Sequence, residues 1–322
     1  MSSGRQRSGE SVAKSCRLHF FPSRWFPPKC RWTMIAIRTV LCPVDFSQAT
    51  ERQLKLATDL CRAFGARLIL HHNLNAMAIG AAVGWMYAAD HRTLSEEGAR
   101  ERLDSLAEAQ TGVNVEVHVT RGPKSASVLA VSELVTADVV VLSAHNVPAE
   151  EHASVTELVL GSGERSVLTL HDNGADRHAL TIQPSATTRQ VTLVPTDLTA
   201  ESHAAVNFAF ELSRTLPLET HLLHLVGRHL TARNEEHAKA DARRHLAALI
   251  PPECTEWTSV HVGTGDPVDG ILHWASDLSA ACVVMGEHSR HPVRRWFSKD
   301  TSRAVLYKAP CPVWYVPGQR AA

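Results

Sequence analysis

The sequence repeats itself, and this repeat limits the possible fold more than any other feature. Residues 37–44 and 190–195 are short β-branched runs that end in Pro-Val-Asp-Phe-Ser and Pro-Thr-Asp-Leu-Thr. An amphipathic stretch follows each run, with small or apolar residues at i, i+3, i+7 and i+10, starting at Leu54 and Val206. This spacing places one stripe of a helix toward a core. The sequence therefore predicts two copies of one unit.

Each copy continues through the same order of strands and helices. Val-rich runs without alternation indicate a parallel sheet that is buried on both faces. Strands that alternate with helices predict βαβ units, and right-handed crossovers favour a doubly wound sheet. The matched pairs are strands 66–71 and 220–224 (with His71 opposite His224), strands 113–120 and 257–262, helices 124–136 and 267–278, strands 138–142 and 281–285, and strands 166–170 and 312–316.

The repeat divides the chain into domains. The first domain is expected at residues 34–172 and the second at 187–317, with a polar, turn-prone linker at 173–186. Residues 1–33 carry seven basic residues against Glu10 and lack the apolar core of a secretory signal. We expect a disordered extension there or a start site placed upstream of Met34, with an Arg- and Ser-rich transit peptide as the alternative.

Charge and cysteine content narrow the function classes. Lys+Arg and Asp+Glu both number 33, which argues against broad binding of nucleic acid or acidic membranes. No apolar run reaches the roughly 18 residues of a membrane span. The 7 cysteines form no C-x-x-C pair, and Cys42 and Cys282 lie in apolar strand-like runs. This pattern favours a reducing compartment, so we expect a cytoplasmic protein.

Several motifs occur in the order found in one known family. They are Leu-Cys-Pro-Val-Asp-Phe-Ser at 41–47, Val-Pro-Thr-Asp-Leu-Thr at 194–199, Val-Val-Met-Gly-Glu-His at 283–288 and Ala-Pro-Cys-Pro-Val-Trp-Tyr-Val at 309–316. With these motifs the sequence resembles the universal stress protein family. The resemblance implies an α/β fold of two tandem domains, each a doubly wound, five-stranded parallel sheet, with flavodoxin-like layering and pairing through the last strands. In a tandem protein that pairing can form within one chain, and a homodimer is a further expectation.

The resemblance also implies a nucleotide site. Many members bind ATP, and their aspartate after the first strand, here Asp45 or Asp197, lies near the adenosine. Asp at a strand end is also ordinary turn chemistry, so both readings stay open. A motif of Gly, two residues, Gly, nine residues, Gly and Ser or Thr holds the phosphates. Glycines allow close approach of the backbone to a phosphate, and a helix N-terminus favours an anion.

The second phosphate loop keeps one glycine of three. Gly286 takes the first position, Ser289 the second and Lys299 the third, and Asp300 takes the Ser/Thr position. We expect Asp300 to cap the helix and to compete with a phosphate for its amides. His288, Arg290 and Lys299 belong to a basic cluster that can hold phosphates through side chains. A solvated loop or a partner contact is the alternative.

The first phosphate loop lacks all three glycines. Ser143-Ala-His-Asn146 stands in place of Gly-x-x-Gly, and the helix opening aligns with Ala153-Ser154 after a shorter loop. The alternative, that Gly161-Ser-Gly163 forms the loop, leaves the last strand unassigned.

Other chemistry finds little support in the sequence. His221 and His224 are three apart on a strand and point to opposite faces, so they do not form a metal site. No Gly-x-Ser-x-Gly elbow and no Walker loop is present, so we expect no enzyme, with weak ATPase activity left open. The apolar stretch 76–89 follows the second strand of the first domain, where it can cap the pocket, fill it or meet a partner.

Two hypotheses remain. The first is a stress-response regulatory protein with degenerate nucleotide sites that acts through contact with an unknown protein partner. The second is a sensor of ATP, with Mg²⁺, that uses Asp197, Gly286 and the basic loop of the second domain.

Overall fold

The computed structural model describes residues 36–74, 95–144, 155–171, 180, 182, 188–199, 202–227, 232–286 and 299–318. The basic segment 1–33 and the apolar segment 76–89 therefore lie outside the described residues. Most of the expected linker 173–186 also lies outside them. Its two described residues, Leu180 and Ile182, are buried against the core.

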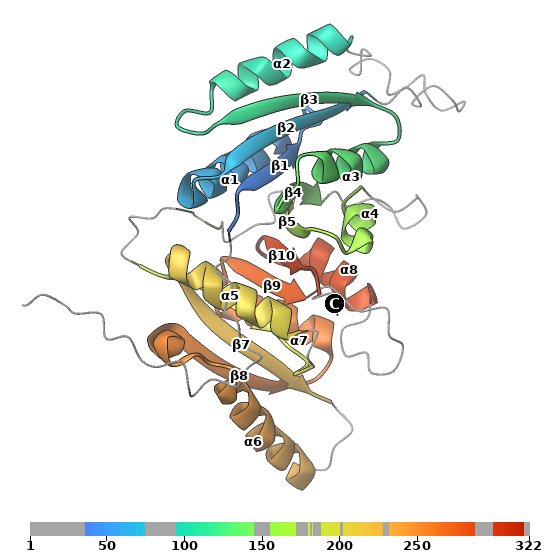
Figure 1. Cartoon of the computed structure of the whole chain (residues 1–322). Helices are drawn as coiled ribbons and strands as arrows, with labels where there is room; N and C mark the ends of the chain where they lie inside the picture. The colour runs from blue at the N-terminus through green and yellow to red at the C-terminus, as the bar shows by residue number, and fades with distance from the viewer. Residues whose placement is uncertain are drawn as a thin grey trace, which may run out of the picture. The chain divides into compact units, whose positions relative to one another are not determined.

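The first copy alternates strands and helices in the predicted order (Figure 1). Gly65, in the left-handed conformation at φ 66°, ends the first helix and donates its amide to the Cys61 carbonyl. The elements are β1 (Thr39–Pro43), α1 (Ala49–Phe64), β2 (Arg67–Leu74), α2 (Glu96–Glu108), β3 (Val115–Arg121), α3 (Lys124–Leu134), β4 (Val139–Ala144), α4 (Val155–Ser162) and β5 (Ser166–His171).

The second copy repeats this order and adds a short 3₁₀ helix. Asp266 caps its third α-helix by accepting from the amides of Val268 and Asp269. The elements are β6 (Gln190–Pro195), α5 (His203–Thr215), β7 (Leu218–Val226), α6 (Ala232–Ala248), η1 (Pro252–Trp257), β8 (Thr258–Thr264), α7 (Pro267–Asp277), β9 (Cys282–Gly286), α8 (Lys299–Lys308) and β10 (Val313–Val316).

The strands form one ten-stranded sheet in the order β3-β2-β1-β4-β5-β10-β9-β6-β7-β8. Within each copy all paired strands run parallel, which confirms the doubly wound α/β prediction. β10 lies antiparallel to β5, and Thr169 Oγ1 donates to the Val313 carbonyl at 3.1 Å. Beside this ladder, Glu157 of α4 accepts from Tyr307 of α8 at 3.0 Å and pairs with Arg303 at 2.7 Å.

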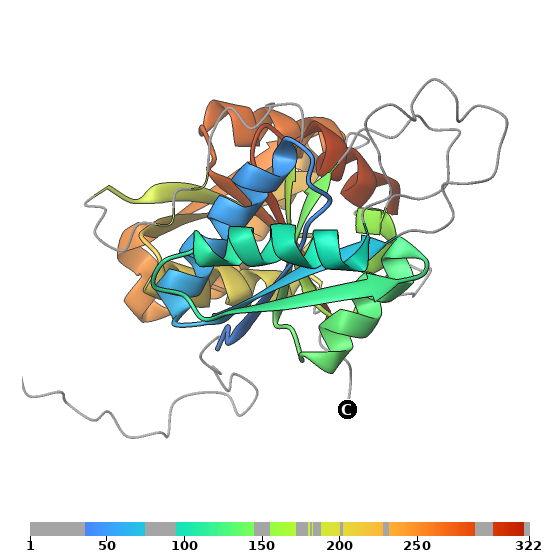
Figure 2. The ribbon, with the colours of Figure 1, turned by 90° about the horizontal axis from the view of Figure 1, so that it is seen from above.

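Helices cover both faces of the sheet, so that two apolar clusters form. In the first copy α1 and α2 pack on one face and α3 and α4 on the other (Figure 2). Successive strand residues alternate between the clusters, as in Val40 and Leu41. The five described cysteines are buried and form no disulfide, and Cys42 and Cys282 lie in strands as predicted.

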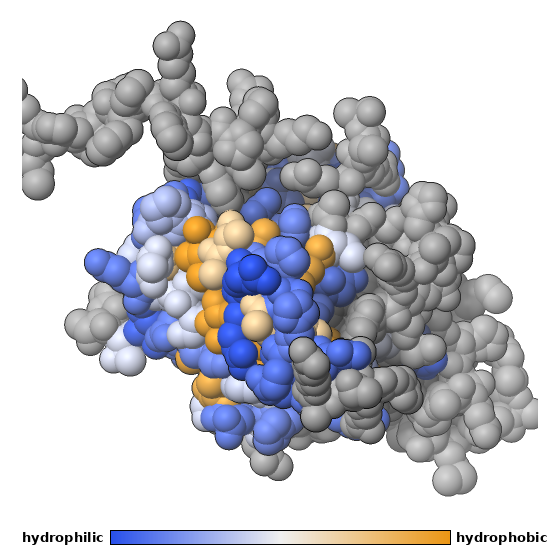
Figure 3. All heavy atoms as spheres, turned by 90° about the horizontal axis from the view of Figure 1, so that it is seen from below, coloured by the Kyte–Doolittle hydropathy of each residue, from blue (hydrophilic) through white to orange (hydrophobic). Residues whose placement is uncertain are grey.

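The helix α6 is largely solvated. Figure 3 views the molecule from the side where α6 and β8 lie in Figure 1, and hydrophilic residues dominate its described surface. Ion pairs run along the helix, including Lys239 to Glu235 at 2.6 Å. In the described part of the chain, no helix is long and apolar enough to cross a membrane.

The two copies differ beneath the helix that follows their third strand. In the first copy His71 Nε2 lies 2.7 Å from Thr120 Oγ1, and Asn73 Nδ2 donates to Ser127 Oγ at 2.8 Å. Burial lowers the pKa of His71 from 6.5 to about 4, so the imidazole is neutral at pH 7.

Apolar packing replaces this polar cluster in the second copy. Leu225 takes the place of Asn73, and it fits because Gly263 and Gly270 have no Cβ. A Cβ at Gly270 would lie only 2.5 Å from Leu225 Cδ1.

The buried His71 predicts a pH dependence of stability. Because its folded pKa lies below its unfolded pKa, its contribution is present above pH 6.5 and is lost as the pH falls toward about 4. Between pH 7 and pH 4.5 this loss amounts to about 2 kcal/mol in the free energy of unfolding, and we expect it to be absent from His71→Leu, which carries the residue of the second copy at this position. Urea denaturation at pH 7 and pH 4.5 measures it. His237→Gln, at a side chain that is 80% exposed, is the control. An unchanged pH dependence in His71→Leu would contradict the assignment.

Candidate functional site

The first strand of each copy ends in a turn that places an aspartate at the carboxyl edge of the sheet. Asp45 Oδ1 accepts from the Ser47 amide at 2.9 Å and from Thr50 Oγ1 at 3.3 Å. Asp197 Oδ1 accepts from the Thr199 amide at 3.0 Å and from its Oγ1 at 2.6 Å. Both aspartates therefore stabilise the turn. They also lie where ligands of doubly wound sheets bind.

The residue after each aspartate has an unusual backbone. Phe46 and Leu198 have φ angles of 61° and 63°, in the left-handed region that bulky residues rarely occupy. Such a conformation persists only when the surrounding structure imposes it. Its presence in both copies shows that this turn is a fixed part of the repeat.

A histidine anchors this turn from the second strand. His72 Nδ1 donates to the Val44 carbonyl at 2.7 Å, and His224 Nδ1 donates to the Thr196 carbonyl at 2.9 Å. Burial is the main cause that lowers the pKa of both imidazoles. These two histidines are therefore equivalent, and the predicted match of His71 with His224 is wrong. The register shows the one-residue offset, since Pro43 pairs with His71 and Pro195 with Leu223.

An aromatic stack covers the site of the first copy. The Phe46 and His72 rings lie 4.6 Å apart, and Arg102 of α2 lies over the Phe46 ring at 4.2 Å. Leu198 replaces Phe46 in the second copy and cannot form this stack. The approach to the sheet edge is therefore more crowded in the first copy.

The crevice between β1 and β4 is filled by the Gln53 side chain, which is 6% exposed. The two strands pair at only two positions and then separate. Beyond that point Gln53 Nε2 donates to the Pro43 carbonyl at 2.7 Å and to the Val141 carbonyl at 2.8 Å. Ser143 Oγ donates to Gln53 Oε1 at 2.8 Å. We call Gln53 and Ser143 the crevice bridge.

The described residues of the second copy form no such bridge. The strand registers place Gly286 at the position of Ser143 and align Pro43 with Pro195. Ala205 follows Pro195 at the same spacing as Gln53 follows Pro43. The Ala205 methyl group is too short to span the crevice, and Gly286 has no side chain. Neither residue can compete with a ligand for the backbone groups of the crevice. The same crevice is therefore closed by side chains in the first copy and lined by small residues in the second.

The sequence analysis missed Gln53, although the signal was present. Its neighbours on the buried face of α1 are Leu54, Leu56 and Ala57. An amide on this face is unusual, because a buried polar group needs a partner. A position-by-position comparison of the two copies would have identified it opposite Ala205.

The structure describes only some of the other predicted site residues. Gly286 ends β9 at the crevice, as the glycine motif requires. His288, Ser289 and Arg290 lie outside the described residues, and Lys299 is described only as the first residue of α8. The predicted N-cap at Asp300 is wrong, because α8 begins at Lys299 and Asp300 lies within its first turn.

The structure tests the alternative phosphate loop at 161–163 and the metal-site reading of His221 and His224. The alternative phosphate loop is wrong, because Gly161 and Ser162 end α4, and residues 166–171 form β5. His221 contacts His261 at 2.9 Å and not His224, which agrees with opposite strand faces. Among the residues that the structure describes, no group of three His, Cys, Asp or Glu is arranged to hold a metal ion.

The sequence profile of the universal stress protein family matches residues 36–171 and 188–317, one match for each copy. The chain belongs to the universal stress protein family. Its fold also agrees with solved structures of this type. One is a universal stress protein from Archaeoglobus fulgidus DSM 4304, with 19% identity and a TM-score of 0.60, covering 87% of this chain and 96% of that chain.

A second solved structure is a functionally unknown protein from Pseudomonas aeruginosa PAO1. Its identity is 15% and its TM-score 0.61, with 88% of this chain and 93% of that chain covered. The search of curated proteins found no match. At these identities the likeness establishes the fold of this universal stress protein, while its site must be judged from its own residues.

The crevice bridge predicts a measurable contribution to stability. Gln53→Ala leaves two carbonyls without their protein donor and opens a cavity, so we expect a loss of roughly 2 to 4 kcal/mol in the free energy of unfolding. Urea denaturation measures this loss. Gln48→Ala is the matched control, because Gln48 is exposed and makes no side-chain cap hydrogen bond. Equal stability of the two variants would show that the bridge is dispensable.

Proposed function

We propose that this universal stress protein is a regulatory binding protein of the stress response that acts through protein contacts and has no catalytic activity of its own. In this proposal its first domain no longer binds a nucleotide. The observation that carries the proposal is the crevice bridge. Gln53 uses both backbone carbonyls at the switch point and fills the space between β1 and β4.

Further features of the first domain support its loss of nucleotide binding. The three family glycines are absent from its loop, and Ser143 replaces the first of them. The Phe46 ring, with Arg102 above it, covers the edge beside Asp45. The carboxyl edge of this sheet, with its crevice closed by Gln53, can instead contact another protein. The five described cysteines, which are buried and form no disulfide, favour a reducing, cytoplasmic location.

A second candidate function is sensing of an adenine nucleotide by the second domain. Its support is the pair Ala205 and Gly286, which leaves the crevice between β6 and β9 without bridging side chains. ATP in this crevice would place its adenosine beside Asp197 and its phosphates near Gly286. The side chains of His288, Ser289, Arg290 and Lys299 would then replace missing glycine amides. A bound nucleotide supplies its own phosphate ligands for Mg²⁺.

Titration of Mg-ATP into the full-length protein tests both proposals. We expect at most one site per chain by calorimetry, because the first crevice is closed. If that one site is the second crevice, Gly286→Ser and Ala205→Gln should each weaken binding by about tenfold or more, since each introduces a side chain from the first copy. Circular dichroism checks that both variants are folded.

Each outcome of this titration has a clear meaning. Two equal sites per chain would contradict closure of the first domain. One site that neither Gly286→Ser nor Ala205→Gln weakens would contradict the sensor function. No binding up to about 1 mM, which corresponds to roughly −4 kcal/mol, would leave protein contact as the remaining function.

The damaged loop of the second domain gives a separate prediction. Lys299→Gly combined with Asp300→Ser restores two family residues at the start of α8. We expect ATP affinity to rise about tenfold or more, because the Asp300 carboxylate no longer repels the phosphates. Lys308→Gly with Asp277→Ser removes one charge of each sign elsewhere and serves as the control. An unchanged affinity would show that the loop is not what limits binding.

A further inference from the structure

A hollow of about 720 Å³ lies at the edge of the first domain opposite to the candidate nucleotide site. Its wall contains residues at or just before the starts of the parallel strands: Thr39, Arg67, Asn114, Asp138 and Arg165. The candidate nucleotide site lies at the carboxyl ends of these strands. The hollow is therefore a separate feature of the domain.

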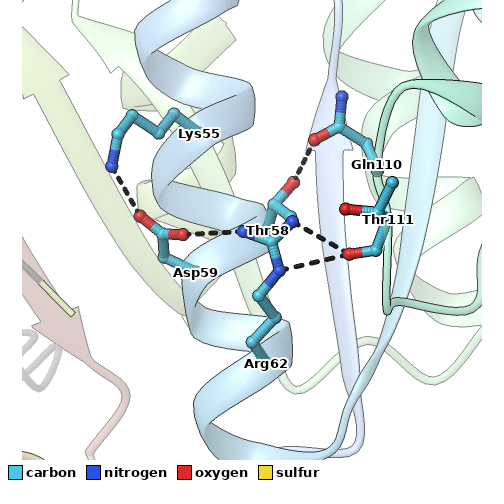
Figure 4. A network of polar contacts seen from close by, with 6 residues as sticks. All are labelled: Lys55, Thr58, Asp59, Arg62, Gln110 and Thr111. Atoms are coloured by element: carbon cyan, nitrogen blue, oxygen red, sulfur yellow. Dashed lines mark hydrogen bonds and ion pairs between the residues drawn. The ribbon is translucent and has the colours of Figure 1, made fainter. Parts of the chain in front are cut away.

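Four arginines line this hollow, and two of them are held in fixed positions. Arg62 donates from Nε and Nη2 to the Thr111 carbonyl at 3.2 and 2.9 Å, and Asp59 Oδ1 accepts from Nη1 at 3.2 Å (Figure 4). Arg67 donates to the Val135 carbonyl at 2.8 Å and to Glu116 at 3.3 Å. These contacts arrange two guanidinium groups in the wall of the hollow before any ligand arrives.

The other two arginines lack such partners within the described residues. Arg165 is half-buried, and its Nε is buried without a hydrogen-bond partner there. Arg38 is exposed, and no described carboxylate forms an ion pair with it. Asp138, the acid in the wall, already accepts from the amides of Arg38 and Thr39 at 2.7 and 2.9 Å. A buried donor without a partner costs about 1–3 kcal/mol, so the Arg165 guanidinium favours an acceptor in the hollow.

The second copy shows that the fold does not require this arrangement. The strand registers place Gln190 at the position of Arg38, Glu219 at that of Arg67 and Cys311 at that of Arg165. Arg62 has a counterpart in Arg214. Three of the four positive charges are therefore particular to the first domain.

We propose that this arginine hollow binds a small oxyanion with at least two negative charges. Guanidinium groups bind phosphate and carboxylate oxygens in pairs, and this geometry favours them over lysine for such ligands. The two fixed arginines supply the positive wall, and Arg38 and Arg165 turn onto the ligand. Binding satisfies the buried Arg165 Nε and reduces the repulsion among the four cations.

Calorimetric titration of the full-length protein with inorganic pyrophosphate and, separately, with citrate tests the proposal. We expect a dissociation constant below about 1 mM at low salt, with weaker binding as the ionic strength rises. Arg165→Gln should weaken binding by about tenfold or more, because one charge-assisted contact is lost. Arg38→Gln should do the same, and since Arg38 is exposed, its replacement leaves the fold intact.

Two controls separate this site from others on the chain. Arg121→Gln removes an exposed arginine that pairs with Glu96 at the other edge of the sheet, and it should leave the affinity unchanged. Arg244→Gln removes an exposed arginine of α6 in the second domain, and it should also have no effect here. Binding of pyrophosphate alone assigns the hollow to phosphate-bearing ligands, and binding of citrate alone assigns it to polycarboxylates. Absence of both, or wild-type affinity in Arg38→Gln and Arg165→Gln, overturns the proposal.

Discussion

The backbone at the centre of each sheet half lacks strand partners where β1 and β4, or β6 and β9, separate. The strands of each pair share hydrogen bonds at two residue pairs and then diverge, because the connections leave toward opposite faces. A buried carbonyl without a partner costs about 1–3 kcal/mol, so something must occupy this crevice. In the first domain the Gln53 amide does so. Its position fixes Ser143, whose own carbonyl accepts from Thr156 at 3.2 Å and so connects the bridge to α4.

The two domains keep the same backbone and differ in what their side chains do. Thr136 and Ser279 occupy equivalent turns with φ angles of 49° in both, and Phe46 and Leu198 agree as closely. Apolar residues of the strands also alternate between the two faces of the sheet in both copies. Three places near the ends of the strands have diverged: the crevice bridge, the polar cluster at His71 and the arginine hollow. A repeat can diverge there because these polar side chains lie outside the two apolar clusters that both copies share.

Much of the fold could be predicted from the sequence, because strand runs and helix stripes are local patterns. The strand at Gln190–Pro195 has its predicted bounds, and the predicted strands follow one another in the predicted order, whereas α2, α6 and η1 were not among the named elements. The match of His71 with His224 failed because a one-residue register shift is set by hydrogen bonding between strands and not by composition. The arginine hollow could not be predicted, since its residues come from separate turns that only the sheet brings together.

The buried thiols have a consequence for how this stress protein can respond to oxidants. Burial raises the pKa of Cys42 and of Cys61 to about 12. The thiolate is the species that reacts with peroxides and disulfides, and at neutral pH its fraction here is on the order of one in 10⁵. Cys254, Cys282 and Cys311 are also enclosed by the core. Burial in the folded domains therefore slows the reaction of these five sulfurs with oxidants.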